Sequence, residues 1–452
     1  MIVTKTLTNF REKGGKGMKI SKWLPAVAAS LLLISGCSST SSGSSSSKGK
    51  VEISIYANNQ GGTEYLNYLQ NDVIKGFEAK NPNIKVKLVK NSDPEGLAKQ
   101  QLAAGGGPDV VNLNGPTSAQ DFAAANYLLP LDKYAKKYNW ADRYYPWAYQ
   151  TVQANGKQVA LPGTYETLVV YYNKDMFKQN GWEIPTSYDE LLTLSKKMDD
   201  KGVIPFAFGS SDFKAANEWW LSLAFNETVG ADDFKKVLTG ETPWNSPEMK
   251  EAITKLNNLW KDGYINDKQS QAITLDDATT LFMSGKAAMK MEGTWMLSTL
   301  KGSPPPFDWD VFTMPSWKDG VEANLPLALG AAVGINKNSK HPDETAKFLD
   351  WMHSNENAEK LLELGGFLPI NGMKAGNLEP HVQKSFDLLN DAMANNQTGY
   401  AAWTYWPPSA ETFAWSNIES VWLGQIDVDT YLEKLQKEFE KDKEKGKLFK
   451  FN

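Results

Sequence analysis

Short strands that alternate with helices open the body of the chain and constrain its fold more than any other feature. Residues 51–56 alternate apolar and polar side chains as a strand does, and helical spacing follows over residues 64–80. The unit is repeated by a strand over residues 84–89, a helix over residues 94–104 and a strand over residues 109–113. Strands separated by helices predict a mostly parallel sheet flanked by helices, with ligands bound beyond the carboxyl ends of the strands.

Two polar loops follow strands of this predicted sheet. The first carries Asn59 and Gln60, and the second begins at Asn114. Amide side chains both donate and accept hydrogen bonds, so these three residues are candidate contacts for a ligand with hydroxyl groups. Asparagine is also common in turns, and a purely structural role is the alternative.

The first residues read as an export signal. Basic residues precede residues 23–34, an apolar segment too short to span about 30 Å of hydrocarbon. Cys37, the one cysteine of the chain, ends the string LISGC, and a serine-rich tether follows over residues 38–50. This arrangement resembles a bacterial lipoprotein signal, which implies that Cys37 is the lipidated first residue of the mature protein. We expect translation to begin at Met18 rather than at Met1. The alternative is a chance cysteine after an ordinary signal peptide.

Composition limits the partners that the remaining 400 or so residues can take. The hydrophobic content of 41% supports a genuine core, enough for two or three domains. The formal net charge is −5, and clustered Lys and Arg residues are confined to the C-terminal region. Binding to phosphate backbones depends on such clusters, so we expect no nucleic-acid partner.

Four strings resemble one family, the extracellular solute-binding proteins of ABC sugar importers, the group that includes maltose-binding proteins. They are LAAGGGPDVV at residues 102–111, VVYYNKDMF at residues 169–177, FMSGKAAMKMEGTW at residues 282–295, and GINK through FLDWM at residues 334–352. The strings follow the order of the family, while residues 375–414 depart most from its pattern.

The resemblance implies a periplasmic-binding-protein-like α/β fold. Two lobes, each with a mostly parallel sheet flanked by helices, would be joined by crossing hinge strands and close on a sugar. The crossings are expected near residues 164–167 and 327–332. The implied organisation is a leader at 1–37, a linker at 38–50, an N-terminal lobe at 51–164 and 330–375, and a C-terminal lobe at 165–329 and 376–452.

Aromatic residues are the strongest candidates for the ligand site. Sugars present C–H faces that pack on aromatic rings and hydroxyls that bond to polar side chains. Trp295 with Glu292 fits this best, and it also falls where the family places a stacking ring; core packing of Trp295 is the alternative. The other candidates are Glu166, Tyr165, Trp219, Asp212, Gly330, Trp403 and Trp406.

Each of these candidates has a structural alternative. Trp219 and Trp220 are adjacent on a predicted helix, so only one of them can face a cleft. Asp212 can cap the next helix along the chain, which is the commoner use of such an aspartate. Gly330 can be an ordinary glycine at the start of a strand, and Glu166 a solvated loop acid.

An enzyme is the rival class of function. The three histidines show no metal-ligand spacing, and we find no nucleophile elbow or phosphate-binding loop. A glycoside hydrolase with paired carboxylates and a surface adhesin that binds polysaccharide stay open as alternatives. We predict a monomeric, lipid-anchored receptor on the outer face of the cell membrane, without cofactor, metal or catalysis, that delivers a di- or oligosaccharide to an ABC permease.

Overall fold

The computed structural model describes residues 50–58, 63–373 and 376–451. The predictions for Cys37, Asn59 and Gln60 lie outside these residues, and residues 49–452 cluster into one unit that is treated by itself below. Within the described ranges, no helix combines the length and the apolar character that a membrane crossing requires.

One five-stranded sheet forms the core of the N-terminal lobe. Its order is β2 (Ile84–Asn91), β1 (Val51–Asn58), β3 (Val110–Leu113), β13 (Ala332–Ile335) and β6 (Ala160–Pro162). The strands β1, β2 and β3 are parallel, while β13 is antiparallel to both β3 and β6. The three strands predicted over residues 51–56, 84–89 and 109–113 are therefore present, in the expected parallel arrangement.

Helices cover this sheet on both faces. The helix predicted over residues 64–80 is present as three consecutive segments, α1 (Thr63–Tyr68), a π-helical turn (Leu69–Ile74) and α2 (Lys75–Lys80). Asp93 caps α3 (Pro94–Ala103) by accepting from the backbone N–H of Gly96 at 2.9 Å. The other helices of this lobe are α4 (Gly115–Ala124), α5 (Asp132–Tyr138), α6 (Trp140–Arg143), α7 (Pro146–Thr151), α15 (Pro342–Met352) and α16 (Asn355–Leu362).

A four-stranded sheet forms the core of the C-terminal lobe. Its order is β11 (Trp309–Phe312), β8 (Leu168–Asn173), β10 (Ala287–Gly293) and β9 (Ile204–Phe206). Only β8 runs against its neighbours in this sheet. The surrounding helices are α8 (Lys174–Asn180), α9 (Tyr188–Asp199), α10 (Asn217–Val229), α11 (Ala231–Thr239), α12 (Pro247–Lys261), α13 (Leu275–Met283), α14 (Met296–Gly302), α17 (Pro380–Ala394), α19 (Pro408–Trp422) and α20 (Val428–Glu444).

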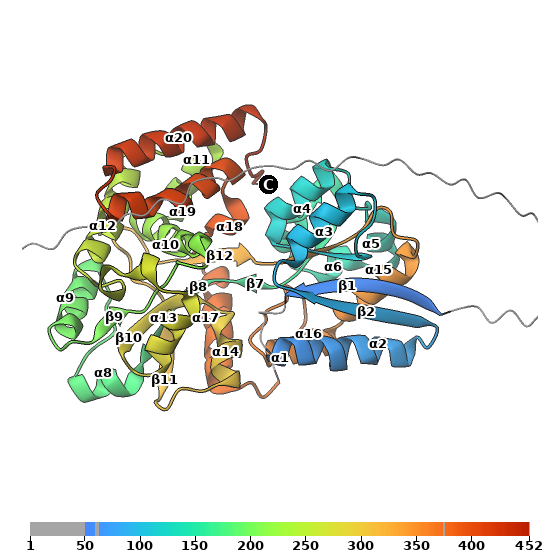
Figure 1. Cartoon of the computed structure of the whole chain (residues 1–452), viewed down its shortest axis with the longest axis horizontal. Helices are drawn as coiled ribbons and strands as arrows, with labels where there is room; N and C mark the ends of the chain where they lie inside the picture. The colour runs from blue at the N-terminus through green and yellow to red at the C-terminus, as the bar shows by residue number, and fades with distance from the viewer. Residues whose placement is uncertain (1–49, 59–62, 374–375, 452) are drawn as a thin grey trace, which may run out of the picture. The chain divides into compact units, whose positions relative to one another are not determined.

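A third sheet lies between the two lobes. It pairs β12 (Leu325–Leu329) with β7 (Tyr165–Glu166) in antiparallel and with β14 (Thr398–Tyr400) in parallel orientation. Figure 1 shows β7 and β12 between the helices of the two lobes. The α/β class with two lobes and crossing strands is confirmed, while the residue boundaries of the lobes stay a prediction.

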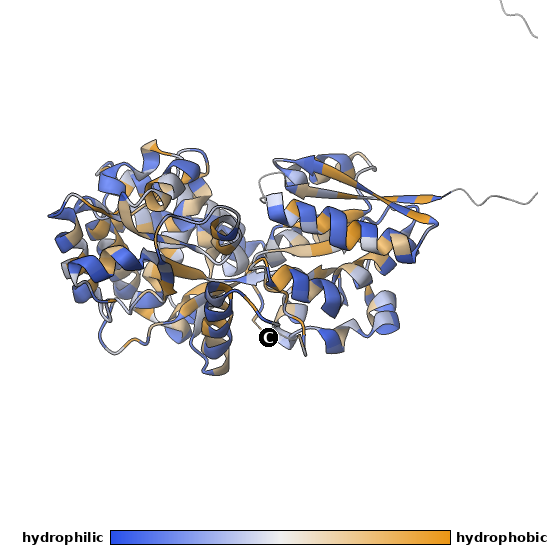
Figure 2. Cartoon of the chain, turned by 90° about the horizontal axis from the view of Figure 1, so that it is seen from below, coloured by the Kyte–Doolittle hydropathy of each residue, from blue (hydrophilic) through white to orange (hydrophobic). Residues whose placement is uncertain are grey.

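The apolar residues follow this layered arrangement. In Figure 2 the strands inside each lobe are largely orange, and the helices around them carry much of the blue, hydrophilic surface. In the N-terminal lobe, Phe77 of α2 packs edge-on against Phe348 of α15, with ring centroids 5.2 Å apart. Burial of such faces is the main stabilising contribution to the fold, and it leaves the ends of the strands free to line a site.

Candidate functional site

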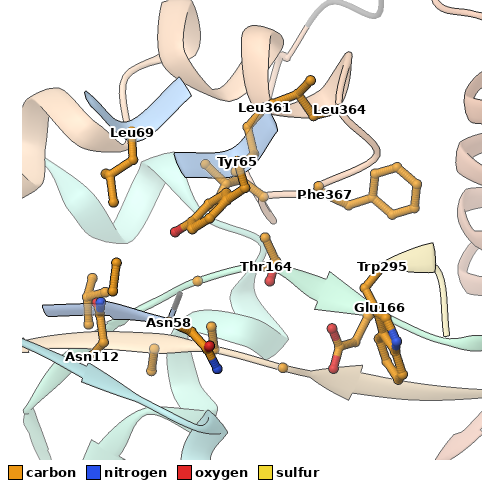
Figure 3. Close-up of a pocket in the computed structure, with 18 of the residues that line it drawn as sticks. Asn58, Tyr65, Leu69, Asn112, Thr164, Glu166, Trp295, Leu361, Leu364 and Phe367 are labelled. Atoms are coloured by element: carbon orange, nitrogen blue, oxygen red, sulfur yellow. The ribbon is translucent and has the colours of Figure 1, made fainter. Parts of the chain in front are cut away.

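A cavity of about 430 Å³ lies beside the crossing strands. The end of β3, the crossing strand β7, the turn after β10 and the segment before β13 all contribute to its wall. Figure 3 shows Trp295 and Glu166 at one end of this cavity and Leu69 and Asn112 at the other. Both lobes and the crossing strands therefore contribute side chains to one site.

Trp295 forms one end of the cavity from the turn between β10 and α14. Its indole Nε1 donates to Glu292 Oε1 at 3.0 Å, and Glu292 Oε2 lies 2.8 Å from Lys290 Nζ. The ring lies over Gly293, where an added Cβ would be 2.0 Å from Trp295 Cζ3. Glycine is required here because the ring occupies the space of a side chain.

Two more tryptophans pack against the ring of Trp295. The centroid of Trp219 lies 5.2 Å away, and that of Trp403 lies 6.1 Å away with the rings nearly perpendicular. Trp219 is buried and does not line the cavity, so it supports Trp295 from behind. Its neighbour Trp220 is fully buried and packs edge-on against Phe206 and Phe208.

Glu166 is the carboxylate of the site and comes from the crossing strand β7. Trp403 Nε1 donates to Glu166 Oε1 at 2.9 Å. The carboxylate lies over Gly330, where an added Cβ would be 2.1 Å from Glu166 Oε1. Burial raises the pKa of Glu166 to about 7, although the Trp403 N–H opposes this shift. The side chain therefore changes charge near neutral pH.

The wall contributed by the N-terminal lobe has a different character. Asn112 and Asn114 lie at the end of β3, and Asn112 Nδ2 donates to the carbonyl of Tyr56. The remaining wall of this end is largely apolar and includes Tyr65, Leu69, Leu361, Leu364 and Leu368. Rings and aliphatic groups of this kind bind by apolar contact, while the amides supply hydrogen bonds.

The structure brings most of the candidates to this cavity. Those that line it are Tyr165, Glu166, Asn114, Trp295 and Gly330, whereas Trp219, Trp403 and Glu292 stand directly behind them. Tyr165 is 1% exposed and packs against Phe367, so it forms part of the floor rather than a mobile contact.

Two candidates lie elsewhere. Asp212 Oδ1 accepts from the backbone N–H of Leu275 at 3.1 Å, in the first turn of the distant helix α13, whose N-cap is Thr274, so Asp212 does not cap the helix that follows it. Trp406 is 1% exposed and packs against Trp244 with ring centroids 5.0 Å apart, inside the core of the C-terminal lobe. Neither residue lines the cavity, and we leave both out of the proposed site.

Sequence reasoning did not find several residues of the wall. Asn112 interrupts the apolar strand β3, and this polar residue was the available signal. Thr164 and Thr294 flank Glu166 and Trp295 without a pattern that distinguishes them. In the part of the chain that the structure describes, no group of three or more His, Cys, Asp and Glu side chains could hold a metal ion.

Comparison with known proteins places these observations in context. A family model described as bacterial extracellular solute-binding protein matches residues 59–359. The multiple sugar-binding protein of Streptococcus mutans is 28% identical over 353 residues, which cover 76% of this chain and 80% of that protein.

Two solved structures are similar over nearly their whole length. The protein RafE in complex with raffinose is 25% identical with a TM-score of 0.70, and the match covers 87% of this chain and all of that chain (100%). A chitin oligosaccharide binding protein is 21% identical with a TM-score of 0.76, and the match covers 87% of this chain and 99% of that chain. The second likeness concerns the fold alone.

Proposed function

We propose a function from this premise: the chain belongs to the family of bacterial extracellular solute-binding proteins. Within this sugar-binding group of ABC transporter receptors, it captures a di- or oligosaccharide outside the cytoplasmic membrane. It then delivers the sugar to an ABC permease. Cys37 anchors the protein to the outer face of the membrane through a lipid.

The observation that carries this proposal is the pairing of Trp295 with Glu166 at the crossing strands. An aromatic ring accommodates the C–H face of a sugar, and a carboxylate beside it accepts from sugar hydroxyls. Asn112 and Asn114 can bond to the same ligand from the opposite lobe. A ligand that contacts both lobes stabilises the closed state selectively, which is how binding is coupled to hinge motion.

The cavity offers little support for a glycoside hydrolase. Hydrolysis of a glycosidic bond generally uses two carboxyl groups about 5–10 Å apart on either side of the bond. Among the described residues that line the cavity, Glu166 is the one acidic side chain. Glu292 stands behind Trp295 and is occupied by the indole N–H and Lys290. The relatives named above are described as binding proteins, in agreement with a receptor.

Thermal denaturation with a panel of sugars tests the proposal. The panel contains raffinose, maltotriose and a chitin oligosaccharide, because proteins similar to this chain are described as binding these sugars. A bound sugar at 100 times its dissociation constant adds about 2.7 kcal/mol to the stability of the native state. Small-angle scattering should show a smaller radius of gyration with that sugar.

Three results would each contradict one part of the proposal. Release of reducing ends from an oligosaccharide by the purified protein would favour the hydrolase. Binding of a polysaccharide without any change in scattering would favour the adhesin. Normal processing and unchanged anchoring of the Cys37→Ala variant would remove the lipid anchor.

A further inference from the structure

Three side chains form a continuous chain of polar contacts behind the cavity. Lys290 is fully buried, and its Nζ lies 2.8 Å from Glu292 Oε2, as an ion pair without hydrogen-bond geometry. The other oxygen, Glu292 Oε1, accepts from Trp295 Nε1 at 3.0 Å. A buried ammonium group costs a large desolvation free energy unless it is paired, so Lys290 favours the position of Glu292 beside it.

The strand β10 explains why these groups meet. Lys290 and Glu292 are two residues apart, so their side chains emerge on the same face of the sheet. Tyr171 of β8 lies directly opposite Lys290, and its hydroxyl donates to the carbonyl of Gly293 at 3.0 Å. The backbone that leads into the turn of Trp295 is therefore held by β8 through both its strand pairing and the hydroxyl of Tyr171.

The indole of Trp295 is held by independent contacts. Gly293 leaves space beneath the ring, Trp219 and Trp403 pack against it, and Glu292 holds the N–H. Packing restricts where the ring lies, but apolar contacts have no direction and distinguish the two χ2 orientations of an indole less than a hydrogen bond does. The hydrogen bond to Glu292 selects one of these orientations.

We propose that Glu292 is a positioning residue that fixes the orientation of Trp295 before the ligand arrives, and that buried Lys290 holds Glu292 in place for this task. The effect of Glu292 on affinity rests on the proposed function, whereas its effect on the orientation of the Trp295 ring does not. A ring that is already ordered loses little conformational freedom on binding, so pre-ordering increases affinity. The alternative is an ion pair that contributes to folding alone.

Two matched double variants separate these roles. Removing one partner of a buried ion pair would leave the other uncompensated, so both charges are removed together. Lys290→Met with Glu292→Gln keeps an acceptor for the indole N–H, whereas Lys290→Met with Glu292→Leu removes it. The two variants have the same charge and similar volumes, and they differ in the hydrogen bond to Trp295.

The first measurement needs no ligand. Hydrogen exchange of the Trp295 indole N–H is followed by NMR in the apo protein, with the resonance assigned from its loss in Trp295→Phe. We expect slow exchange in the wild type and the Gln variant, and exchange faster by about tenfold or more in the Leu variant, because a partly buried hydrogen bond is lost. Equal exchange in both double variants would overturn the proposal.

The second measurement is affinity for raffinose and maltotriose by calorimetry. The Leu variant should bind about tenfold more weakly than the Gln variant. Altered exchange with equal affinity in the two variants would overturn the role of Glu292 in binding. Altered exchange together with no binding of any sugar by the wild type would overturn the proposed function and leave the positioning of Trp295 intact.

A third variant keeps the proposal testable if the Leu variant does not fold. Gly293→Ala leaves Lys290 and Glu292 unchanged but places a methyl group where the indole lies. We expect a changed near-UV circular dichroism spectrum and faster exchange of the Trp295 indole N–H. Exchange and affinity equal to those of the wild type would show that the orientation of the ring is not set by these contacts.

Discussion

Trp295 and Leu69 line opposite ends of the same cavity and are supported in different ways. The indole N–H of Trp295 is bonded to Glu292, and beside it Glu166 accepts from Trp403. Leu69, on the π-helical turn, is 2% exposed and packs with the apolar core of the N-terminal lobe. One end therefore fixes the direction of polar groups, while the other supplies a surface without direction.

Because of this difference, we expect the two ends of the cavity to contribute differently to sugar affinity and to folding stability. A side chain that stands in a cleft and is held by its neighbours contributes to ligand binding more than to folding, as interface anchors do. A side chain that belongs to the core and also lines a cavity contributes mainly to folding. Substitutions at the two ends should therefore have opposite consequences in binding and unfolding experiments.

The largest effect is expected at the apolar end. Leu69→Ala should lower the free energy of unfolding by about 2–5 kcal/mol, because buried methyl groups are lost and a cavity is left. Urea denaturation of the apo protein measures this change. An affinity loss larger than the loss of stability would place Leu69 among the binding residues and remove the contrast between the two ends.

Trp295→Ala tests the other end. We expect the free energy of sugar binding to weaken by about 2 kcal/mol or more, while the stability of the apo protein falls less than in Leu69→Ala. Calorimetry with the sugar found in the panel and urea denaturation of the same variant give both values. A large loss of stability with unchanged affinity would assign Trp295 to the core.

The pH dependence of sugar affinity provides a further test of the polar end of the cavity, where Glu166 lies. Sugar hydroxyls donate to the ionised carboxylate, so affinity should rise as the pH increases from 6 to 8 through the pKa of about 7. The change should approach tenfold, the factor that corresponds to one unit of pKa. Calorimetry at several pH values measures it, and Glu166→Gln is the control that should show no such dependence.

The stability of the apo protein should respond to Glu166 with the opposite sign. The pKa is raised from 4.5 to about 7 in the folded state, so the folded protein holds this proton more tightly than the unfolded chain. This contribution is fully present below pH 4.5 and is lost as the pH rises to about 7. A wild-type pH profile parallel to that of Glu166→Gln would contradict the raised pKa.

The smallest effect is expected for the amide at the N-terminal wall. Asn114→Ala removes a neutral side chain at the end of β3, so the affinity should weaken by about 0.5–1.5 kcal/mol. Competition binding against the wild type resolves a change of this size. A loss as large as that of Trp295→Ala would show that both ends of the cavity fix the ligand with comparable strength.

Local patterns predicted much of this architecture. Alternation identified β1 and β2, whereas β3, in which Val110 and Val111 are both buried, was predicted from its place after a helix and a glycine-rich turn. The short spacing of Glu292 and Trp295 also indicated that they lie close together. Glu292 lies at the end of β10 and Trp295 in the turn that follows, where its indole donates back to the carboxylate. Features that depend on neighbours along the chain were accessible to sequence reasoning.

Features that depend on distant packing were not accessible. Trp403 and Trp406 share one aromatic string, yet α18 (Ala402–Tyr405) directs Trp403 toward Glu166 and leaves Trp406 against Trp244. Lys290 is fully buried, although lysine is rarely buried unless it is paired. Which ring faces a cleft is decided by the elements that pack around it, and these come from far along the chain.

The position of β13 in the first sheet has a consequence for how the protein is made. This strand lies between β3 and β6, so β6 (residues 160–162) has no partner in the sheet until residue 335 has been synthesised. The sheet of the N-terminal lobe therefore cannot be completed until the segment between β6 and β13, which forms most of the C-terminal lobe, has been made. The order of strands therefore makes the two lobes interdependent during folding, because one lobe closes its sheet only with a strand that follows the other along the chain.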